Sequence, residues 1–409
     1  MKITLLTNEY PPYIYGGAGV HVEYLSRELL RLDGGAHEVN VFSFGDQAES
    51  SGKLRVQGVE AGFTLPAQDP RHAKFMDTVQ RNLVMAGLVG EADIVHCHTW
   101  YTHLAGCLVK QLSGAKLVLT THSLEPHRPW KVEQLGSAYH ASSWVERTAY
   151  QNADGVVAVS EAMRRDVHEL YGVADHKIEV IPNGIDLAHY RPTPDEGTLK
   201  RYGVDPAIPA ILFVGRITRQ KGILHLVNAL KYLPPGLQVV LCAGAPDTAE
   251  IEQEMAARVE AARAESKNSI VWIAKMVPKD DLIALYSHAS LFVCPSVYEP
   301  FGIINLEAMA CETPVVAAAV GGIPEVVVDG ETGVLVPLET KGEVDFEPAD
   351  PERFARALAA AIAELMGDEA RRGAMGRAAR ERALAKFSWT AVAERTVAFY
   401  KRLLELPSS

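Results

Sequence analysis

The feature that most constrains the fold is an alternation, along the whole chain, of short apolar runs rich in β-branched residues with longer amphipathic segments. The runs at residues 3–7 and 94–98 have the length and composition of buried parallel strands, and the segment at 20–32 has helical periodicity. This alternation predicts doubly wound α/β sheets of parallel strands, which bind ligands outside the carboxyl ends of their strands. Further strands are expected at residues 39–42, 116–120, 155–159, 178–181, 211–215, 237–243, 270–273, 291–295, 314–317 and 334–336.

A turn-rich passage in the middle of the chain separates two such series. Residues 182–201 are rich in Pro, Gly, Asn and Asp, and the alternation restarts at residue 211. We therefore expect one Rossmann-like domain at residues 1–190 and a second at residues 191–387. Two doubly wound domains are expected to direct their strand ends toward a central cleft.

Composition narrows the choice of partners. The chain has 409 residues, and its 51 acidic side chains outnumber its 40 basic ones, for a net charge of -11. Nucleic acids and anionic membranes both attract basic surfaces, so we expect neither as a partner. The sequence shows no signal peptide or membrane span, and its five cysteines form no CxxC pair, which favours a reduced cytoplasmic protein. The oligomeric state stays open, a homo-oligomer included.

The richest motif runs from Glu299 to Glu307. It joins a predicted strand to a predicted helix, so that Glu299 lies in the loop and Glu307 lies one to two turns inside the helix. The N–H groups of Phe301, Gly302 and Ile303 are at the positive end of that helix, where an anion binds favourably. Two carboxylates for hydroxyl groups beside an anion site indicate a sugar nucleotide. In isolation, the same pair would indicate only a capping acid and a solvated glutamate.

Two further loops have anion-binding features. Arg216 ends a strand and Lys221 begins the next helix, and two converging cations suit a diphosphate, although either alone would be an ordinary surface residue. Gly16 and Gly17 open a helix after the first strand, where glycine lets the backbone approach an anion. The latter loop does not match a dinucleotide fingerprint, because Val22 stands where a small residue is needed.

Histidines are concentrated at residues 96–127. A zinc site is one interpretation, but its ligands would come from different strand ends without a second Cys or His pair at metal spacing, so we expect no metal. His122 directly follows a central strand, where a donor to a sugar hydroxyl or a phosphate belongs. In the loop that follows, Arg128 and Lys131 form a local basic pair and Trp130 is placed to stack on a sugar, unless the loop is an ordinary surface excursion.

Together these residues resemble the retaining nucleotide-sugar glycosyltransferases of family 4, which have the GT-B fold. More narrowly, the segments at residues 96–101, 121–130 and 297–302 are similar to the bacterial glycogen synthase group and its actinobacterial branch, which includes the α-maltose-1-phosphate synthases. The matching landmarks are Gly16-Gly17, residues 182–186 with Asn183, Arg216 with Lys221-Gly222, Glu299 with Glu307, and residues 321–325.

The resemblance implies roles for these residues. Arg216 and Lys221 would bind the donor diphosphate, and Glu307 would bind the ribose. Glu299 and the N–H groups of residues 301–303 would hold the transferred glucose, and His122 would contact its 6-hydroxyl. Gly16 and Gly17 would line the donor site, whereas Arg128, Trp130, Lys131 and Asn183 are candidates for the acceptor side. A last helix, at about residues 388–409, would cross back onto the N-terminal domain.

The expected reaction is transfer of glucose with retention of the α configuration, with ADP-glucose as donor and no cofactor or metal. The acceptor would be the 4-hydroxyl of an α-glucan or of glucose-1-phosphate. Two departures keep this choice open, because the larger glycogen synthases have Lys-Thr where this chain has Ile14-Tyr15 and Asp where it has Thr99. A third departure is Glu312, where the family commonly has Gly.

Other functions remain as alternatives. A family 4 enzyme that uses a UDP- or GDP-sugar and another small or lipid acceptor is the nearest one. An NAD-dependent oxidoreductase and a non-catalytic sugar-binding protein would share the doubly wound architecture. The incomplete glycine fingerprint disfavours the first of these two, and the Arg216–Lys221 pair disfavours the second.

Overall fold

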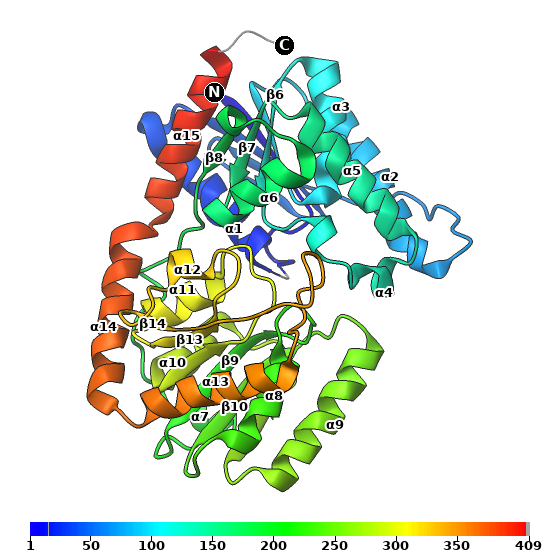
Figure 1. The fold of residues 1–409 in the computed structure, drawn as a ribbon. Coiled ribbons are helices and arrows are strands. Elements are labelled where there is room, and N and C mark those ends of the chain that lie inside the picture. The colour runs from blue at the N-terminus through cyan, green and yellow to red at the C-terminus, as the bar shows by residue number, and fades with distance from the viewer. Residues whose placement is uncertain (15, 406–409) are drawn as a thin grey trace. The chain divides into compact units, whose positions relative to one another are not determined.

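The computed structural model describes residues 1–14 and 16–405, and it divides the chain into two compact units (Figure 1). Unit 1 comprises Met1–Gly184 and the segment from Trp389 onward, and unit 2 comprises Ile185–Ser388. The expected boundary at residue 190 falls just after the end of the first of these segments. Tyr15 and residues 406–409, which belong to the Ile14-Tyr15 departure and to the end of the expected last helix, lie outside the described residues.

Unit 1 is built on an eight-stranded sheet of order β3-β4-β2-β1-β5-β6-β7-β8. Every neighbouring pair is parallel except β3 with β4, as the alternation of strands and helices predicts for the rest of the sheet. The strands are β1 (Lys2–Thr7), β2 (Glu38–Phe44), β3 (Ala48–Ser51), β4 (Leu54–Val59), β5 (Ile94–His98), β6 (Lys116–Thr121), β7 (Gly155–Ala158) and β8 (Ile178–Val180).

The helices of unit 1 come from both ends of the chain. They are α1 (Gly17–Leu29), α2 (Ala73–Leu88), α3 (His103–Ser113), α4 (Lys131–Leu135), α5 (Ala138–Asn152), α6 (Glu161–Tyr171) and α15 (Trp389–Glu405). One core combines Ile3 and Leu5 of β1 with Val22 of α1 and with Val397 and Phe399 of α15. The last helix therefore packs on the N-terminal sheet, as the resemblance implies (Figure 1).

Unit 2 has a six-stranded, fully parallel sheet of order β11-β10-β9-β12-β13-β14. Its strands are β9 (Ala210–Arg216), β10 (Gln238–Gly244), β11 (Ser269–Ile273), β12 (Leu291–Cys294), β13 (Val315–Ala318) and β14 (Gly333–Val336). Its helices are α7 (Glu196–Arg201), α8 (Ile223–Ala229), α9 (Ala249–Glu265), α10 (Lys279–His288), α11 (Ile303–Ala310), α12 (Ile323–Val326), α13 (Pro351–Met366) and α14 (Glu369–Lys386). The fold class is therefore confirmed: two doubly wound α/β units with parallel sheets.

Strand order fixes where each unit binds ligands. In unit 1, the chain runs outward from β1 toward β2 on one side and toward β5 on the other, and in unit 2 it does the same from β9 toward β10 and β12. A doubly wound sheet has its binding crevice at this switch point, outside the carboxyl ends of the strands. The loops after β1 and β5, and those after β9 and β12, are therefore expected to form the binding sites.

Sequence patterns located most of the strands but missed two. Strands β3 and β4 form an antiparallel pair at the edge of unit 1, with short, mostly exposed β3 reading Ala-Glu-Ser-Ser. The edge strand β3 shows neither an apolar run nor a strong alternation, because it buries little surface. Strand β4 does alternate, with Leu54 and Val56 buried and Arg55 and Gln57 exposed, but it has no continuous apolar run.

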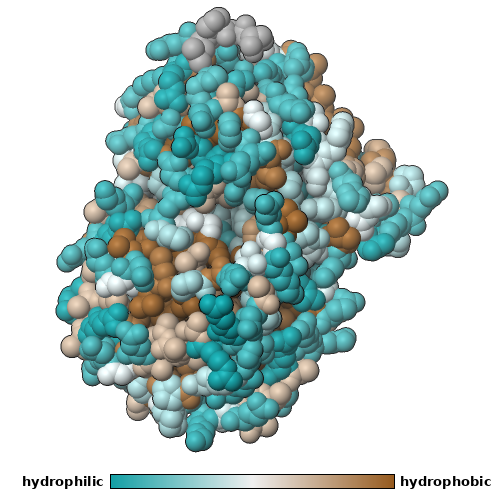
Figure 2. All heavy atoms as spheres, in the orientation of Figure 1, coloured by the Kyte–Doolittle hydropathy of each residue, from teal (hydrophilic) through white to brown (hydrophobic). Residues whose placement is uncertain are grey.

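Most of the face drawn in Figure 2 is hydrophilic. The hydrophobic side chains on this face gather over the part of unit 2 that holds α11 and α12 (Figure 2). Within residues 1–14 and 16–405, no helix is both long enough and apolar enough to cross a membrane.

Candidate functional site

The switch point of unit 2 brings together the predicted donor residues, beginning with Arg216 at the end of β9. Its guanidinium Nη1 donates to Oδ1 of Asp247 at 2.8 Å, and Asp247 is mostly buried. The backbone N–H of Asp247 donates to the carbonyl of Ile217 at 3.1 Å, which fixes the carboxylate beside the strand end. Asp247 thus orients Arg216, a role that sequence patterns did not reveal.

Lys221 and Glu299 form a close ion pair. Nζ of Lys221 donates to Oε2 of Glu299 at 2.6 Å, and both side chains are largely buried. Ser296 donates to the same carboxylate oxygen at 3.3 Å. Gly222, which follows the lysine, has a φ of +61°, and a Cβ there would lie 2.0 Å from the carbonyl oxygen of Pro295. Only glycine therefore allows the loop after β9 to approach the loop after β12 this closely.

The Glu299 loop leads into α11 as the sequence predicts. Gly302 adopts a φ of +97° at the N-cap and has no side chain with which to cap this helix, so the N–H groups of the first turn can bind a ligand. Gly321 and Gly322, which follow β13, support the loop from behind. The N–H of Gly322 donates to the carbonyl of Glu299 at 2.9 Å, and a Cβ on Gly321 would lie 2.1 Å from that same oxygen.

Glu307 lies in the second turn of α11, held by two tyrosines. The hydroxyl of Tyr190 donates to Oε1 at 2.8 Å, and that of Tyr286 donates to Oε2 at 3.0 Å. Burial raises the pKa of Glu307 above its usual value, and the two hydrogen bonds oppose this shift. The tyrosines fix the direction of both oxygens, which leaves the remaining lone pairs oriented for hydroxyl donors.

In unit 1, the glycine loop after β1 is already occupied by a carboxylate. Gly16 is the N-cap of α1, and its N–H donates to Oε2 of Glu9 at 2.9 Å. Gly17 begins the helix, and a Cβ on Gly19 would lie 2.8 Å from Cβ of Glu9. The loop therefore binds an anionic group through its backbone, and a ligand phosphate at the same N–H would displace Glu9.

His122 belongs to a histidine cluster at the carboxyl ends of β5 and β6. Its Nε2 shares a hydrogen bond of 3.0 Å with Nδ1 of His98, and the ring of His21 from α1 lies 4.9 Å from its own ring, edge to face. Burial lowers the pKa of His21 to about 4 and holds the pKa values of His98 and His122 well below 6.5. All three rings are therefore neutral at neutral pH, and His122, which is partly exposed, acts as a neutral hydrogen-bonding group.

Asn183 is tied to this cluster. Its Oδ1 and Nδ1 of His21 are 2.7 Å apart, and Asn183 is 6% exposed. The next residue, Gly184, packs so closely on α15 that a Cβ would lie 2.6 Å from the ring of Trp389. Asn183 therefore contacts His21, whose ring in turn lies against His122, and its predicted place on the acceptor side stays a prediction.

The predicted basic pair of the loop after β6 is engaged within unit 1. Arg128 lies 3.5 Å from Oε1 of Glu125, which is fully buried, and its own side chain is 12% exposed. Nζ of Lys131 donates to Oε1 of Gln134 at 2.8 Å within α4, and Trp130 is the partly buried N-cap of that helix. The two cations are thus three residues apart, with Arg128 before α4 and Lys131 at its start. Each already has a partner within unit 1, which a bound phosphate would have to replace or share.

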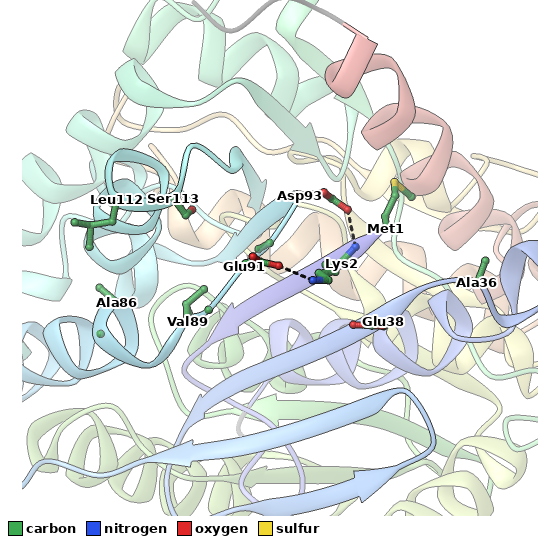
Figure 3. Close-up of a pocket in the computed structure, with 13 residues that line it drawn as sticks. Met1, Lys2, Ala36, Glu38, Ala86, Val89, Glu91, Asp93, Leu112 and Ser113 are labelled. Carbon is green, nitrogen blue, oxygen red and sulfur yellow. Dashed lines mark hydrogen bonds and ion pairs between the residues drawn. The ribbon is translucent and has the colours of Figure 1, made fainter.

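A surface pocket of about 750 Å³ lies at the opposite edge of the unit 1 sheet (Figure 3). Lys2, Glu38 and Asp93 line it at the amino ends of β1, β2 and β5, and Lys2 pairs with Glu91 at 2.7 Å across it. It contains none of the predicted site residues. Because doubly wound sheets bind ligands at their carboxyl ends, we assign the pocket no part in the chemistry.

Sequence patterns found the loops but missed the residues that orient them. Tyr190, Asp247 and His21 each fix a predicted residue from a distant part of the chain. Glu9 fixes the N–H of Gly16 from within the same loop, seven residues away. Of these residues, only His21 could have been suspected from the sequence. It lies about one turn into the helix that follows the glycine loop, and that loop follows β1 at the switch point.

Comparison with known proteins identifies the family of this chain. Residues 15–189 match the model of Glycosyltransferase Family 4, and residues 200–382 match that of Glycosyl transferases group 1. The chain is 44% identical over 411 residues to an α-maltose-1-phosphate synthase from Mycolicibacterium smegmatis, covering 98% of this chain and 100% of that protein.

Two further relatives fit the same family. A glycogen synthase from Mycobacterium tuberculosis is 30% identical over 429 residues, covering 98% of this chain and 94% of that one. The solved structure of a sucrose-phosphate synthase from Thermosynechococcus elongatus superposes with a TM-score of 0.76 at 26% identity, covering 98% of both chains. The resemblance inferred from the sequence is confirmed: the chain belongs to glycosyltransferase family 4, as a hexosyltransferase of the group that contains the α-maltose-1-phosphate and glycogen synthases.

Proposed function

We propose that this enzyme is an α-maltose-1-phosphate synthase, which moves glucose from ADP-glucose to the 4-hydroxyl of glucose-1-phosphate with retention of the α configuration. The observation that carries the proposal is the 44% identity to the mycobacterial synthase over 98% of the chain. The relation to glycogen synthase at 30% identity supports the same chemistry with a glucan acceptor, which is the second candidate.

On the donor side, each group is held by a partner within unit 2. Arg216, held by Asp247, and Lys221, paired with Glu299, meet the diphosphate, and the open N-terminus of α11 adds its N–H groups. Glu307, oriented by its two tyrosines, accepts hydrogen bonds from the ribose hydroxyls.

The transfer step follows from where charge develops. As the bond between the anomeric carbon and the phosphate oxygen breaks, negative charge grows on the leaving diphosphate, and the two cations and the helix N-terminus stabilise it in place. These groups supply the stabilisation that a divalent cation would otherwise give, so we expect transfer without a metal. The leaving phosphate oxygen accepts the proton of the attacking 4-hydroxyl, which reaches the same face of the sugar.

Glu299 positions the sugar and does not form a covalent bond in this mechanism. It is already engaged with Lys221 and Ser296, which suits a hydrogen-bonding role better than that of a free nucleophile. Trapping of a glucosyl–Glu299 adduct by mass spectrometry would contradict this step.

The acceptor phosphate needs cations in unit 1, and Arg128 and Lys131 are the candidates. Glu125 holds the Arg128 guanidinium in one direction, which lowers the entropic cost of binding but also neutralises part of its charge. A glucan end has no phosphate and gains nothing from these side chains. The two acceptors therefore make different demands on one loop.

The experiment replaces Arg128 and Lys131 together by Ala and compares the two acceptors with ADP-glucose as donor. We expect KM for glucose-1-phosphate to rise by about tenfold or more, as for loss of a charged hydrogen bond, while KM for glycogen stays nearly unchanged. Arg165→Ala, which removes an exposed arginine on α6, is the matched control. Equal losses for both acceptors in a variant that keeps its melting temperature would refute the assignment of the loop. Comparing ADP-glucose with UDP-glucose in wild type tests the donor.

A further inference from the structure

The histidine cluster of unit 1 has a feature that sugar binding does not require. One ring nitrogen from each of His21, His98 and His122 lies within 4.8 Å of one from each of the other two. These residues come from α1 and from the ends of β5 and β6, so they do not share a local segment with the spacing of a metal-binding motif.

The separations approach those of a metal site. In a tetrahedral zinc site with Zn–N bonds of about 2.0–2.1 Å, the ligand nitrogens lie about 3.3 Å apart. Nδ1 of His98 and Nε2 of His122 are already 3.0 Å apart. The third nitrogen, from His21, lies within 4.8 Å of the other two ligand nitrogens, so it needs to approach them by at most about 1.5 Å.

The residues around the histidine rings leave one nitrogen of each ring able to coordinate a metal ion. Asn183 Oδ1 engages Nδ1 of His21, which leaves Nε2 for an ion, and a ligand histidine commonly has its other nitrogen fixed in this way. His98 is fully buried and its Nε2 has no hydrogen-bond partner among the described residues. That nitrogen can therefore take the proton when Nδ1 turns its lone pair to a metal.

The proton balance is simple. A neutral imidazole offers the lone pair of one ring nitrogen while the other nitrogen keeps its proton. The hydrogen bond between His98 and His122 holds one proton between two nitrogens that must both be lone pairs in a complex. Whichever ring carries that proton moves it to its other nitrogen, and both rings stay neutral.

We propose that His21, His98 and His122 form a binding site for a zinc-class divalent ion, which blocks glucosyl transfer by occupying His122. Three imidazoles suit Zn²⁺, Co²⁺, Ni²⁺ or Cu²⁺ and not Mg²⁺ or Ca²⁺, which prefer oxygen ligands. His122 is partly exposed, so an ion and a water ligand reach the cluster from its side. The blocking effect rests on the proposed function, whereas the binding does not.

The first measurement titrates Co²⁺ into the full-length protein without an affinity tag and follows the visible absorption of the ion. We expect about one Co²⁺ per chain with the intense spectrum of tetrahedral coordination, displaced by Zn²⁺ but not by Mg²⁺. X-ray absorption of the Zn²⁺ complex should show imidazole nitrogens at about 2.0–2.1 Å. An octahedral spectrum, or several equivalent weak sites, would overturn the proposal without any variant.

Variants then assign the ligands. His21→Ala and His98→Ala should each weaken Co²⁺ binding by more than about 100-fold, and Asn183→Ala, which frees His21, by about 10- to 100-fold. His103→Gln is the matched control, because His103 is also buried but lies outside the cluster. Circular dichroism and melting temperature establish that each variant folds. Unchanged affinity in folded His21→Ala and His98→Ala would refute the ligand assignment.

The last measurement links binding to transfer. Zn²⁺ should inhibit the wild-type enzyme at the concentration at which it binds, and a chelator should restore the rate. Full activity with the site saturated would refute the blocking effect. If the enzyme transfers no glucose at all, the proposed function fails, and the binding measurements still decide the metal site.

Discussion

The Lys221–Glu299 pair makes a prediction with two opposite effects in a single variant, Glu299→Gln. In the structure, the lysine donates to the carboxylate at 2.6 Å, yet we assign the lysine to the donor diphosphate and the glutamate to the sugar. The two assignments compete for one cation. Removing the negative charge should release Lys221 for the diphosphate while depriving the transferred glucose of its partner.

The magnitudes follow from the pair. A hydrogen bond between charged groups contributes about 1.5–3 kcal/mol, and solvent reaches part of Lys221, whose side chain is 20% exposed. Release of the lysine should therefore favour ADP by about 1 kcal/mol, or about fivefold tighter binding. Loss of an oriented group at the reacting sugar should lower kcat by about 100-fold.

Calorimetric titration with ADP and initial-rate kinetics with ADP-glucose measure the two effects. Lys221→Met should weaken ADP binding by about 10- to 100-fold, and the double variant should bind ADP like Lys221→Met, because no lysine is left to release. Weaker ADP binding in Glu299→Gln would mean that the pair serves the diphosphate as a unit. An unchanged kcat would remove Glu299 from the sugar site.

Three further predictions test the supports of the site and of the fold. Tyr190→Phe removes one of the two hydrogen bonds to Glu307, so KM for the donor should rise by about tenfold with little change in kcat; an unchanged KM would separate Glu307 from the ribose. Glu146 is buried beside Glu125, and burial, with the charge of Glu125, raises its pKa to about 8. The folded state therefore holds this proton where the unfolded chain, with a pKa of 4.5, does not, and the stability that the proton contributes is lost as the pH rises from 4.5 through about 8. Plots of melting temperature against pH for wild type and Glu146→Gln should differ in slope between pH 4.5 and about 8. Parallel plots would contradict the raised pKa. Gly222→Ala forces a Cβ to 2.0 Å from a carbonyl oxygen at a positive φ, so it should weaken ADP binding, as measured by titration; full affinity would show that the loop has room.

The fold was largely predictable because parallel strands are buried on both faces and appear in the sequence as continuous apolar runs. All six strands of unit 2 lie where such runs occur. The edge strand β3 contains no such run. It is held in place by its pairing with β4, and its own polar composition does not predict a strand.

The candidate site was predictable as a set of loops. The strand order of a doubly wound sheet places Arg216 and Glu299 at one switch point, and His122 falls at the other because it directly follows a central strand. What could not be predicted is which partner each group has. Asp247 is 31 residues from Arg216, and Tyr190 is 117 residues from Glu307, so these contacts exist only after the chain has folded.

The histidine cluster shows the same limit. The spacing of histidines along the chain argued against a metal site, and the folded structure brings His21 to two of them from a helix far away in the sequence. The spacing of residues along a chain reveals only sites whose ligands share a local segment.

The most direct test of the function is to identify the product. The pure enzyme would be incubated with ADP-glucose and with either glucose-1-phosphate or glycogen, and the products analysed by mass and by the configuration of the new bond. We predict a phosphorylated, α-1,4-linked disaccharide formed faster than glycogen is extended. Elongated glucan as the sole product would contradict the proposed acceptor, and a β-linked product would contradict retention.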